Sequence, residues 1–246
     1  MKIVGVIPAR YGSTRFPGKP LVDLLGRPLI QWTIEGSQKS KLLNDLIVAT
    51  DDDRIKKAAE AVGAKVAMTP SDLPTGSDRI HAAIQNIDCD IVVNIQGDEP
   101  LVTGELIDRL AQAFLDDPNL DMATLAHPIT DEELESPNAV KVVLNHKDEA
   151  LYFSRYPIPY SRSKAAEMGS HEGCLKHIGM YAYTKKFLKK FCETPPAFIE
   201  KAESLEQLRA LYLGAKIKVV RVKEASLGVD TPEDLIKLEK LLSQGR

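Results

Sequence analysis

The segment from residue 8 to residue 21 gathers the side chains best suited to binding a polyphosphate. It reads Pro-Ala-Arg-Tyr-Gly-Ser-Thr-Arg-Phe-Pro-Gly-Lys-Pro-Leu and follows an apolar run, residues 3–7, that predicts a buried strand. Its candidate binding groups are three cations, two glycines and two hydroxyl side chains: Arg10, Arg15, Lys19, Gly12, Gly18, Ser13 and Thr14. Hydroxyl and backbone donors cradle phosphate oxygens, cations offset their charge, and glycine lets the backbone approach closely. We therefore expect this phosphate-binding segment to hold a phosphate chain.

The spacing within the phosphate-binding segment departs from two common nucleotide-binding motifs. A Walker loop has four residues between its first glycine and a Gly-Lys pair, and a serine or threonine follows the lysine. Here five residues separate Gly12 from Gly18, and Pro20 follows Lys19. The Gly-x-Gly-x-x-Gly fingerprint of dinucleotide-binding folds is absent from the sequence. A solvated basic loop is the alternative, but open α/β sheets bind ligands past the carboxyl ends of strands, where this segment lies.

Asp98 is a candidate metal ligand. It follows an apolar run at residues 91–95 and stands next to Gly97, at the carboxyl end of a predicted buried strand. Carboxylate oxygens in such a position suit a hard cation. The alternative is a turn-forming aspartate ahead of Pro100. The acidic run at residues 51–53 opens a predicted helix instead, where carboxylates cap the helix and favour its dipole.

Composition and length restrict the class of protein. The chain has 246 residues and a net charge of −3, so it can bury a substantial core, and non-specific binding to nucleic acid is not favoured. Its three cysteines, Cys89, Cys174 and Cys192, predict neither a disulfide framework nor a metal-binding pair. No apolar run approaches the about 18 residues of a membrane span, and no signal-peptide pattern is present. We expect a cytoplasmic protein without membrane or nucleic-acid partners.

Apolar strands alternate with helical patterns through the first half of the chain. We expect strands at residues 3–7, 46–49, 66–68 and 91–95, and helices at 28–37, 53–62, 78–86 and 104–114. In the second half we expect strands at 122–129, 139–144, 178–183 and 217–222, helices at 203–213 and 232–242, and a polar loop at 161–173. The alternation predicts an α/β fold, a Rossmann-like three-layer α/β/α sandwich with a mixed, mainly parallel sheet and an inserted region.

Residues 12–19 resemble the signature of the sugar nucleotidyltransferases, Gly-x-(Ser/Thr)-Arg-hydrophobic-Pro-x-Lys. The longer form of the segment is similar to that of the 3-deoxy-D-manno-octulosonate (Kdo) cytidylyltransferase family. Further motifs of that family follow in order at residues 47–51, 76–79, 94–100, 138–143, 150–155, 205–209 and 228–234. The resemblance implies a fold of the nucleotide-diphospho-sugar transferase type. It also implies transfer of CMP from CTP to Kdo, giving CMP-Kdo and pyrophosphate for lipopolysaccharide biosynthesis.

The resemblance assigns roles to individual residues. The implied catalytic residues are Arg10, Lys19, Asp98 and Asp230, with Mg²⁺ held by the two aspartates. The implied CTP-binding residues are Arg10, Ser13, Arg15, Lys19, Gly76, Ser77 and Arg79. The implied sugar-binding residues are Gln96, His177, Tyr181, Glu206 and Gln207. His177 and Tyr181 are four residues apart on a predicted strand, so we expect them on one face.

Ordinary structural roles are open for several of these residues. Asp230 could favour the positive end of a helix whose start is marked by the Thr-Pro pair at residues 231–232. Ser77 could be the N-cap of the next predicted helix. His177 could be a histidine at a strand edge, and Glu206 a solvated helix residue.

The resemblance also implies how the chain is organised. It implies one nucleotidyltransferase domain, residues 1–246, in which residues 1–120 mainly bind CTP and 121–225 mainly bind the sugar and form a homodimer. Residues 226–246 would hold the metal-ligand segment and a closing helix. The nearest alternative is the same chemistry on 8-amino-3,8-dideoxy-Kdo or on another sugar acid. A nucleotide-sugar-binding regulatory protein without catalysis is a further alternative, which the presence of the whole catalytic set opposes.

Overall fold

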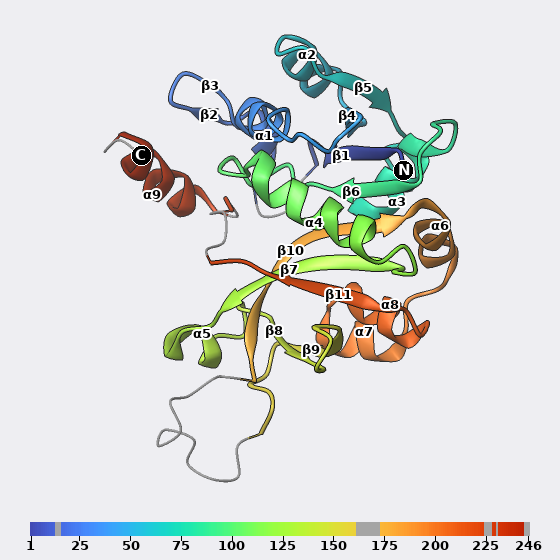
Figure 1. Ribbon diagram of the computed structural model, residues 1–246. Helices are drawn as coiled ribbons and strands as arrows, with labels where there is room; N and C mark the ends of the chain where they lie inside the picture. Colours follow the sequence, from blue (N-terminus) through green and yellow to red (C-terminus); the bar gives the residue numbers. More distant parts are fainter. Residues whose placement is uncertain (13–15, 161–172, 224–227, 230, 244–246) are drawn as a thin grey trace. The chain divides into compact units, whose positions relative to one another are not determined.

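The computed structural model describes residues 1–12, 16–160, 173–223, 228–229 and 231–243. The chain divides into two compact units. The first unit comprises Met1–Ala111 and Ser226–Arg246, and the second comprises Gln112–Ala225. Figure 1 labels the helices and strands of both units in chain order.

The first unit contains a parallel sheet with the strand order β6-β1-β4-β5. Its strands are β1 (Ile3–Ala9), β4 (Asp45–Thr50), β5 (Lys65–Met68) and β6 (Ile91–Asn94). Both faces of β6 are buried, and β1 is buried along nearly its whole length. Continuous apolar strands of this kind are typical of a parallel sheet with both faces covered, so the strand predictions for this half are confirmed.

Helices follow the strands of the first unit in alternation. They are η1 (Lys19–Leu21), α1 (Leu29–Ser37), α2 (Asp53–Glu60), α3 (Gly76–Ile84), the first part of α4 (Gly104–Asp116) and α9 (Pro232–Ser243). A short antiparallel pair, β2 (Asp23–Leu24) and β3 (Arg27–Pro28), precedes α1. The Thr231 hydroxyl accepts a hydrogen bond from a first-turn N–H of α9, and Pro232 is the first residue of that helix, as predicted.

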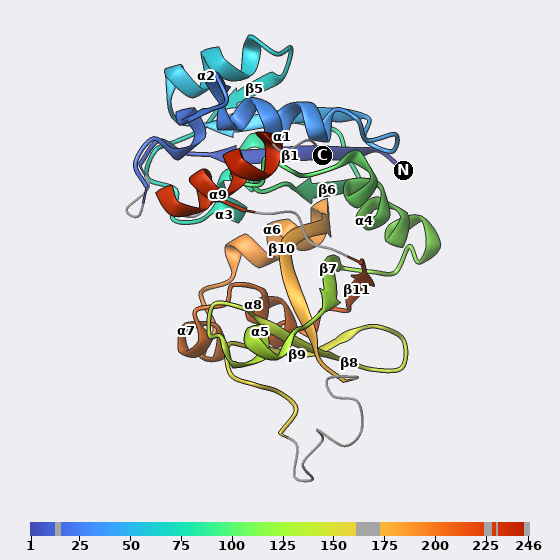
Figure 2. The same ribbon diagram turned by 90° about the vertical axis from the view of Figure 1, so that its left-hand side faces the viewer.

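The second unit contains a mixed group of strands. They are β7 (Met122–Pro128), β8 (Lys141–Leu144), β9 (Ala150–Ser154), β10 (Leu175–Thr184) and β11 (Ile217–Arg221). Strand β7 is parallel to β11 and antiparallel to β10, while β8 is antiparallel to both β10 and β9. The helices are α5 (Asp131–Glu135), α6 (Lys185–Glu193), α7 (Phe198–Glu203) and α8 (Gln207–Tyr212). Helix α8 packs against α7 and β9, and Figures 1 and 2 show these elements side by side.

Some predicted elements differ from the structure. The helix predicted at residues 203–213 is wrong in extent, because Ser204 adopts a left-handed conformation with φ of 51° and ends α7. Helix α8 then starts only at Gln207. Strand β9, the short pair β2–β3 and helices α5, α6 and α7 were not predicted. Among the helices of the described residues, none combines the length and the apolar character needed to cross a bilayer.

Strand β10 carries a bulge. Ile178 and Tyr181 pair with consecutive residues of β7, Leu125 and Thr124, so the two residues between them have no counterpart on β7. An even number of extra residues preserves the alternation of side chains between the faces. His177 and Tyr181 therefore lie on the same face, as predicted, and the bulge shortens the distance between them along the sheet.

Candidate active site

A backbone hydrogen bond joins Tyr11 and Gly18 of the phosphate-binding segment after β1. The Gly18 N–H donates to the Tyr11 carbonyl oxygen at 2.9 Å. Gly18 has a φ of 71°, which glycine adopts without strain, and it immediately precedes η1, whose first residue is Lys19. This hydrogen bond and the backbone conformation of Gly18 fix the position from which the Lys19 side chain extends. Ser13 and Arg15, two of the implied CTP-binding residues, lie outside the described residues.

Lys19 and Asp98 meet although 79 residues separate them in sequence. The Lys19 Nζ donates to the Asp98 Oδ2 at 2.5 Å, and the two side chains are 14% and 32% exposed. The preceding residue, Gly97, lies so close to β1 that a Cβ there would be 3.0 Å from the Pro8 carbonyl oxygen. Glycine therefore lets the turn after β6 approach the end of β1, where the phosphate-binding segment begins.

The backbone of Asp98 also holds the segment that leads to Asp230. The Val229 N–H donates to the Asp98 carbonyl oxygen at 2.9 Å. Val229 is fully buried in an apolar cluster with Leu238 of α9, which anchors this segment. Asp230 itself lies outside the described residues. Within the described part of the chain, no group of three or more His, Cys, Asp or Glu side chains could hold a metal ion.

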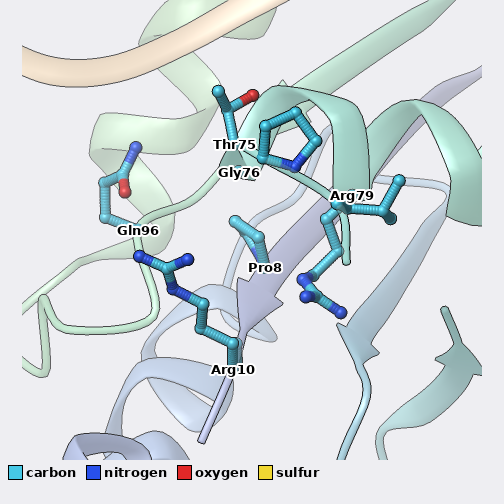
Figure 3. A pocket seen from close by; sticks show the side chains of 9 residues that line it. Pro8, Arg10, Thr75, Gly76, Arg79 and Gln96 are labelled. Atoms are coloured by element: carbon cyan, nitrogen blue, oxygen red, sulfur yellow. The ribbon is translucent and has the colours of Figure 1, made fainter. Parts of the chain in front are cut away.

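A pocket of about 150 Å³ lies at the carboxyl end of β1 in the first unit. Pockets that enclose a whole drug-sized ligand measure about 300–1,000 Å³, so this one suits a single part of a nucleotide. Figure 3 shows the Arg10 and Gln96 side chains on one side of the pocket and Arg79 beyond Pro8. The lining residues are Pro8, Ala9, Arg10, Leu73, Pro74, Thr75, Gly76, Arg79 and Gln96.

The start of α3 forms one wall of this pocket. The Thr75 hydroxyl accepts the Asp78 N–H at 3.2 Å, so Thr75 is the N-cap and Gly76 the first helical residue. The alternative that Ser77 caps this helix is therefore wrong. Ser77 lies in the first turn, 1% exposed. The first N–H groups of a helix have no partner in the preceding turn, and the Thr75 side chain satisfies one of them here.

Arg79 is held by other side chains of the first unit. Its guanidinium donates to the Thr69 Oγ1 at 2.6 Å and to the Asp51 Oδ2 at 3.3 Å, and its side chain is 3% exposed. The neighbouring Asp52 is the N-cap of α2, where it accepts the Arg54 N–H at 2.9 Å. Asp51 and Asp52 thus serve an ion pair and a helix cap, which confirms the structural interpretation of residues 51–53.

His177 is a buried polar residue of the second unit. Its Nε2 lies 2.9 Å from the Thr124 Oγ1. Burial lowers the pKa of His177 to about 3, so the ring is neutral near pH 7. Its ring centroid lies 5.0 Å from that of Phe153 and 5.4 Å from that of Tyr181. The structure therefore brings two of the implied sugar-binding residues together.

Two further implied sugar-binding residues stand at the start of α8. Glu206 is the residue before this helix, and Gln207 is its first residue and is buried. Arg209 holds the helix in place, because its guanidinium binds both carboxylate oxygens of the buried Glu200 at 2.8 and 2.5 Å. Gln96, the remaining implied sugar-binding residue, belongs to the first unit.

Two side chains around His177 were not predicted. Thr124 had a weak signal, because it is a hydroxyl residue inside an otherwise apolar strand pattern at residues 122–126. Phe153 had no signal, because an apolar residue in a short strand is usually part of a core. Both are identified only through their contacts with His177.

Several known proteins resemble this chain in sequence and in fold. A family model described as cytidylyltransferase matches residues 4–217. The chain is 79% identical, over 243 residues, to a 3-deoxy-manno-octulosonate cytidylyltransferase of Bdellovibrio bacteriovorus, with coverage of 99% of this chain and 98% of the relative. A solved structure of CMP:2-keto-3-deoxy-manno-octonic acid synthetase complexed with CTP has a TM-score of 0.94, 44% identity and coverage of 100% of both chains.

A more distant solved structure shares the fold alone. This is 4-diphosphocytidyl-2C-methyl-D-erythritol synthase from Anaerococcus prevotii, with a TM-score of 0.64, 16% identity and coverage of 98% of this chain and 99% of that one. These matches and the parallel strands of the first unit confirm the predicted Rossmann-like α/β fold.

Proposed function

The chain belongs to the cytidylyltransferase family, and we propose that it transfers CMP from CTP to Kdo with release of pyrophosphate. The observation that carries this proposal is the 2.5 Å contact between Lys19 and Asp98. It joins a cation suited to phosphate and a carboxylate suited to metal at the carboxyl end of a parallel sheet. The names of the relatives and the CTP in the similar solved structure support the choice of substrates.

The reaction requires positioning and charge compensation more than covalent chemistry. The anomeric hydroxyl of the sugar attacks the α-phosphate of CTP, and pyrophosphate leaves. Arg10 and Lys19, with Arg15, hold the triphosphate and offset the negative charge that develops on the leaving pyrophosphate. The first turn of α3, with Gly76 and Ser77, binds the nucleoside at the pocket wall. Arg79 contributes by fixing α3, because its guanidinium is engaged with Thr69 and Asp51.

Asp98 and Asp230 are the proposed Mg²⁺ ligands. The Asp98 carboxylate fits this role, since it offers hard oxygen donors and is partly exposed. Support for Asp230 comes from the residue before it, because the Val229 N–H is bonded to the Asp98 backbone. When bound, Mg²⁺ offsets phosphate charge and lowers the pKa of a coordinated hydroxyl. Lys19 balances the Asp98 charge within the protein itself.

The sugar acid is proposed to bind Gln96, His177, Tyr181, Glu206 and Gln207. Kdo is rich in hydroxyl groups, and these side chains supply donors and acceptors at short range. The neutral His177 and the adjacent Tyr181 ring are the parts of this set that the second unit brings into contact.

A homodimer formed through the second unit is also proposed. Several large apolar side chains of that unit are exposed, and monomeric proteins rarely expose apolar surface over a wide area. They are Leu151, Tyr156, Tyr160, Phe198 and Tyr212. Light scattering coupled to size-exclusion chromatography measures the oligomeric state. A cytoplasmic location, in the service of lipopolysaccharide biosynthesis, is proposed because the scattered cysteines suit a reducing compartment.

Pyrophosphate release tests the proposed function. The purified chain is assayed with CTP, Mg²⁺ and one sugar acid at a time: Kdo, 8-amino-3,8-dideoxy-Kdo or sialic acid. We expect the highest kcat/KM with Kdo. A higher kcat/KM with the 8-amino sugar would mean that the proposed reaction is right but that the 8-amino sugar is the preferred substrate. No release with any sugar acid would refute the enzyme and favour a regulatory protein that only binds nucleotide sugars.

The proposed metal ligands have a separate test. Asp98→Asn and Asp230→Asn should each lower kcat about a hundredfold or more, which is typical when one main electrostatic stabiliser is lost. Near-normal turnover of Asp98→Asn at saturating Mg²⁺ would contradict the assignment of Asp98.

A further inference from the structure

The bulge in β10 directs two backbone carbonyl groups at one buried hydroxyl. The Thr124 Oγ1 lies 3.1 Å from the Ile178 carbonyl oxygen and 2.9 Å from the Met180 carbonyl oxygen. The same hydroxyl lies 2.9 Å from the His177 Nε2. Thr124 is fully buried and His177 is 8% exposed, so bulk water does not reach this hydroxyl.

The number of hydrogen atoms available at this cluster determines which group donates in each contact. A hydroxyl has one hydrogen, and a carbonyl oxygen can only accept. The Thr124 hydrogen must therefore point to the carbonyl groups of Ile178 and Met180. Otherwise oxygen lone pairs would face each other in a buried site with no hydrogen between them. In the remaining contact the Thr124 oxygen accepts, and the His177 Nε2 donates.

The other ring nitrogen of His177 then has a defined state. Burial keeps the imidazole neutral, and a neutral imidazole carries one hydrogen, so Nδ1 bears a lone pair. The backbone of His177 is fixed by its N–H, which donates to the Val140 carbonyl oxygen at 2.8 Å. The rings of Phe153 and Tyr181 flank the imidazole. Among the residues that the structure describes, none forms a hydrogen bond with Nδ1.

We propose that Thr124 is a positioning residue that fixes His177 in the Nε2–H tautomer, so that the His177 Nδ1 accepts a hydrogen bond from a hydroxyl of the sugar acid. This inference rests on the proposed function and deepens it, because it names the atom and the direction of one hydrogen bond. It follows that this subsite requires a donor on the substrate. A sugar acid whose corresponding hydroxyl is methylated or replaced by fluorine would leave the Nδ1 lone pair without a donor.

Nuclear magnetic resonance of the imidazole nitrogens tests the tautomer without any need for turnover. The chain has five histidines, and a His177→Gln spectrum identifies the signals of His177 by their absence. In the free ¹⁵N-labelled protein at pH 7 we expect a protonated Nε2 and an unprotonated Nδ1. Addition of Kdo together with CMP, which cannot release pyrophosphate, should move the Nδ1 signal toward the protonated range and leave the Nε2 signal in place.

Two substitutions of Thr124 separate positioning from packing. Thr124→Ser keeps the hydroxyl, so the tautomer should be unchanged and the KM for Kdo should stay within about twofold. Thr124→Val removes the acceptor of the Nε2–H, so the Nδ1–H tautomer should become populated. The KM for Kdo should then rise about five- to a hundred-fold, the scale of one lost buried hydrogen bond, while the KM for CTP changes little. The wild-type and Thr124→Ser spectra keep the test valid even if Thr124→Val does not fold.

The outcomes distinguish this inference from the proposed function. A wild-type spectrum with a protonated Nδ1 would overturn the inference even if the chain turns over CTP and Kdo. An Nδ1 signal that stays in place at Kdo concentrations that saturate turnover would also overturn it. If the expected tautomer is present but no sugar acid supports pyrophosphate release, the proposed function is wrong and the role of Nδ1 toward a sugar falls with it.

Discussion

The contact between Lys19 and Asp98 predicts that the effects of substituting the two residues on activity are coupled. Their nitrogen and oxygen atoms are 2.5 Å apart, and both side chains are mostly shielded from solvent, so a change in either alters the charge environment of the other. We expect Lys19→Met and Asp98→Asn to be non-additive in a double-mutant cycle. Each single substitution leaves one charge without its opposite, whereas the double substitution removes both charges.

The expected magnitudes follow from this geometry. Each single substitution should lower kcat/KM for CTP about a hundredfold, since each removes a group that stabilises the developing charge. Independent effects would multiply to a loss of about ten-thousandfold. Residues in direct contact couple by about 0.5–3 kcal/mol, which is a factor of about 2–150 in rate. The double variant should therefore lose about 70- to 5,000-fold, less than the product of the single losses.

Pyrophosphate release at varied CTP, with saturating Kdo and Mg²⁺, measures kcat/KM for the four proteins of the cycle. These are the wild type, the two single variants and the double variant. Urea unfolding should show that each variant remains folded under the assay conditions, so that a loss of kcat/KM reports on the candidate site and not on stability. Lys65 and Asp45 form a matched control in the same unit, with 2.7 Å between nitrogen and oxygen and no place in the candidate site. Lys65→Met should leave kcat/KM within about twofold.

Two results would contradict a coupled role of Lys19 and Asp98. The loss of kcat/KM in the double variant could equal the product of the two single losses, to within about 0.5 kcal/mol. Lys19 and Asp98 would then not act as a unit. A similar loss of kcat/KM in Lys65→Met would show that the assay reports general damage to the first unit.

Three further predictions concern other parts of the chain. The Arg54 guanidinium lies 3.6 Å from the ring centroid of Tyr11 in the phosphate-binding segment, so Arg54→Lys should raise the KM for CTP about threefold or more in the pyrophosphate assay. Arg209→Met leaves the buried Glu200 without its partner and should lower the free energy of unfolding in urea by about 3–5 kcal/mol. Burial lowers the pKa of His177 from 6.5 to about 3, so its contribution to stability is fully present above pH 6.5 and is lost as the pH falls toward 3. Below pH 6.5, His177 should therefore lower the free energy of unfolding by up to about 1.4 kcal/mol for each pH unit. The His177→Gln variant should lack this contribution.

Each of these predictions has an outcome that contradicts it. CTP kinetics of Arg54→Lys that match those of Lys56→Ala, a change of a partly exposed residue on the same helix, would show that stacking on Tyr11 does not order the segment. A loss below about 1 kcal/mol in Arg209→Met would mean that the pair with Glu200 is not needed to hold α8. Equal acid slopes for the wild type and His177→Gln would mean that His177 does not titrate as a buried group.

Strands and helix ends that depend on a few consecutive residues could be predicted from the sequence. The apolar runs of β1 and β6 predicted buried strands, because a parallel sheet covered on both faces needs apolar side chains in both directions. The Thr231–Pro232 start of α9 was predictable for a similar reason, since capping depends on a few consecutive residues. The break at Ser204 was not, because a left-handed serine carries no distinctive local pattern.

The distances within the candidate site depend on the register of the strands. A regular strand would separate His177 and Tyr181 by about 13 Å along its axis, at about 3.3 Å per residue. The bulge in β10 brings their ring centroids to 5.4 Å. The sequence predicted the shared face, because the side-chain alternation survives an even number of extra residues. It could not predict the bulge, which is defined by the pairing with β7 and by the Thr124 hydroxyl.

The residue types and their order specify the chemistry available to this protein: a phosphate-binding segment after the first strand, a carboxylate after a buried strand, and a set of polar groups suited to a sugar acid. How each charged group is used depends on the tertiary structure. Arg79 and Arg209 are engaged by Asp51 and Glu200, whereas Lys19 meets Asp98 at the end of the sheet. The sequence shows that these residues are charged but does not show which residue pairs with which. Their partners are set by strand order and helix packing, which bring together residues far apart in the chain and have no local signature.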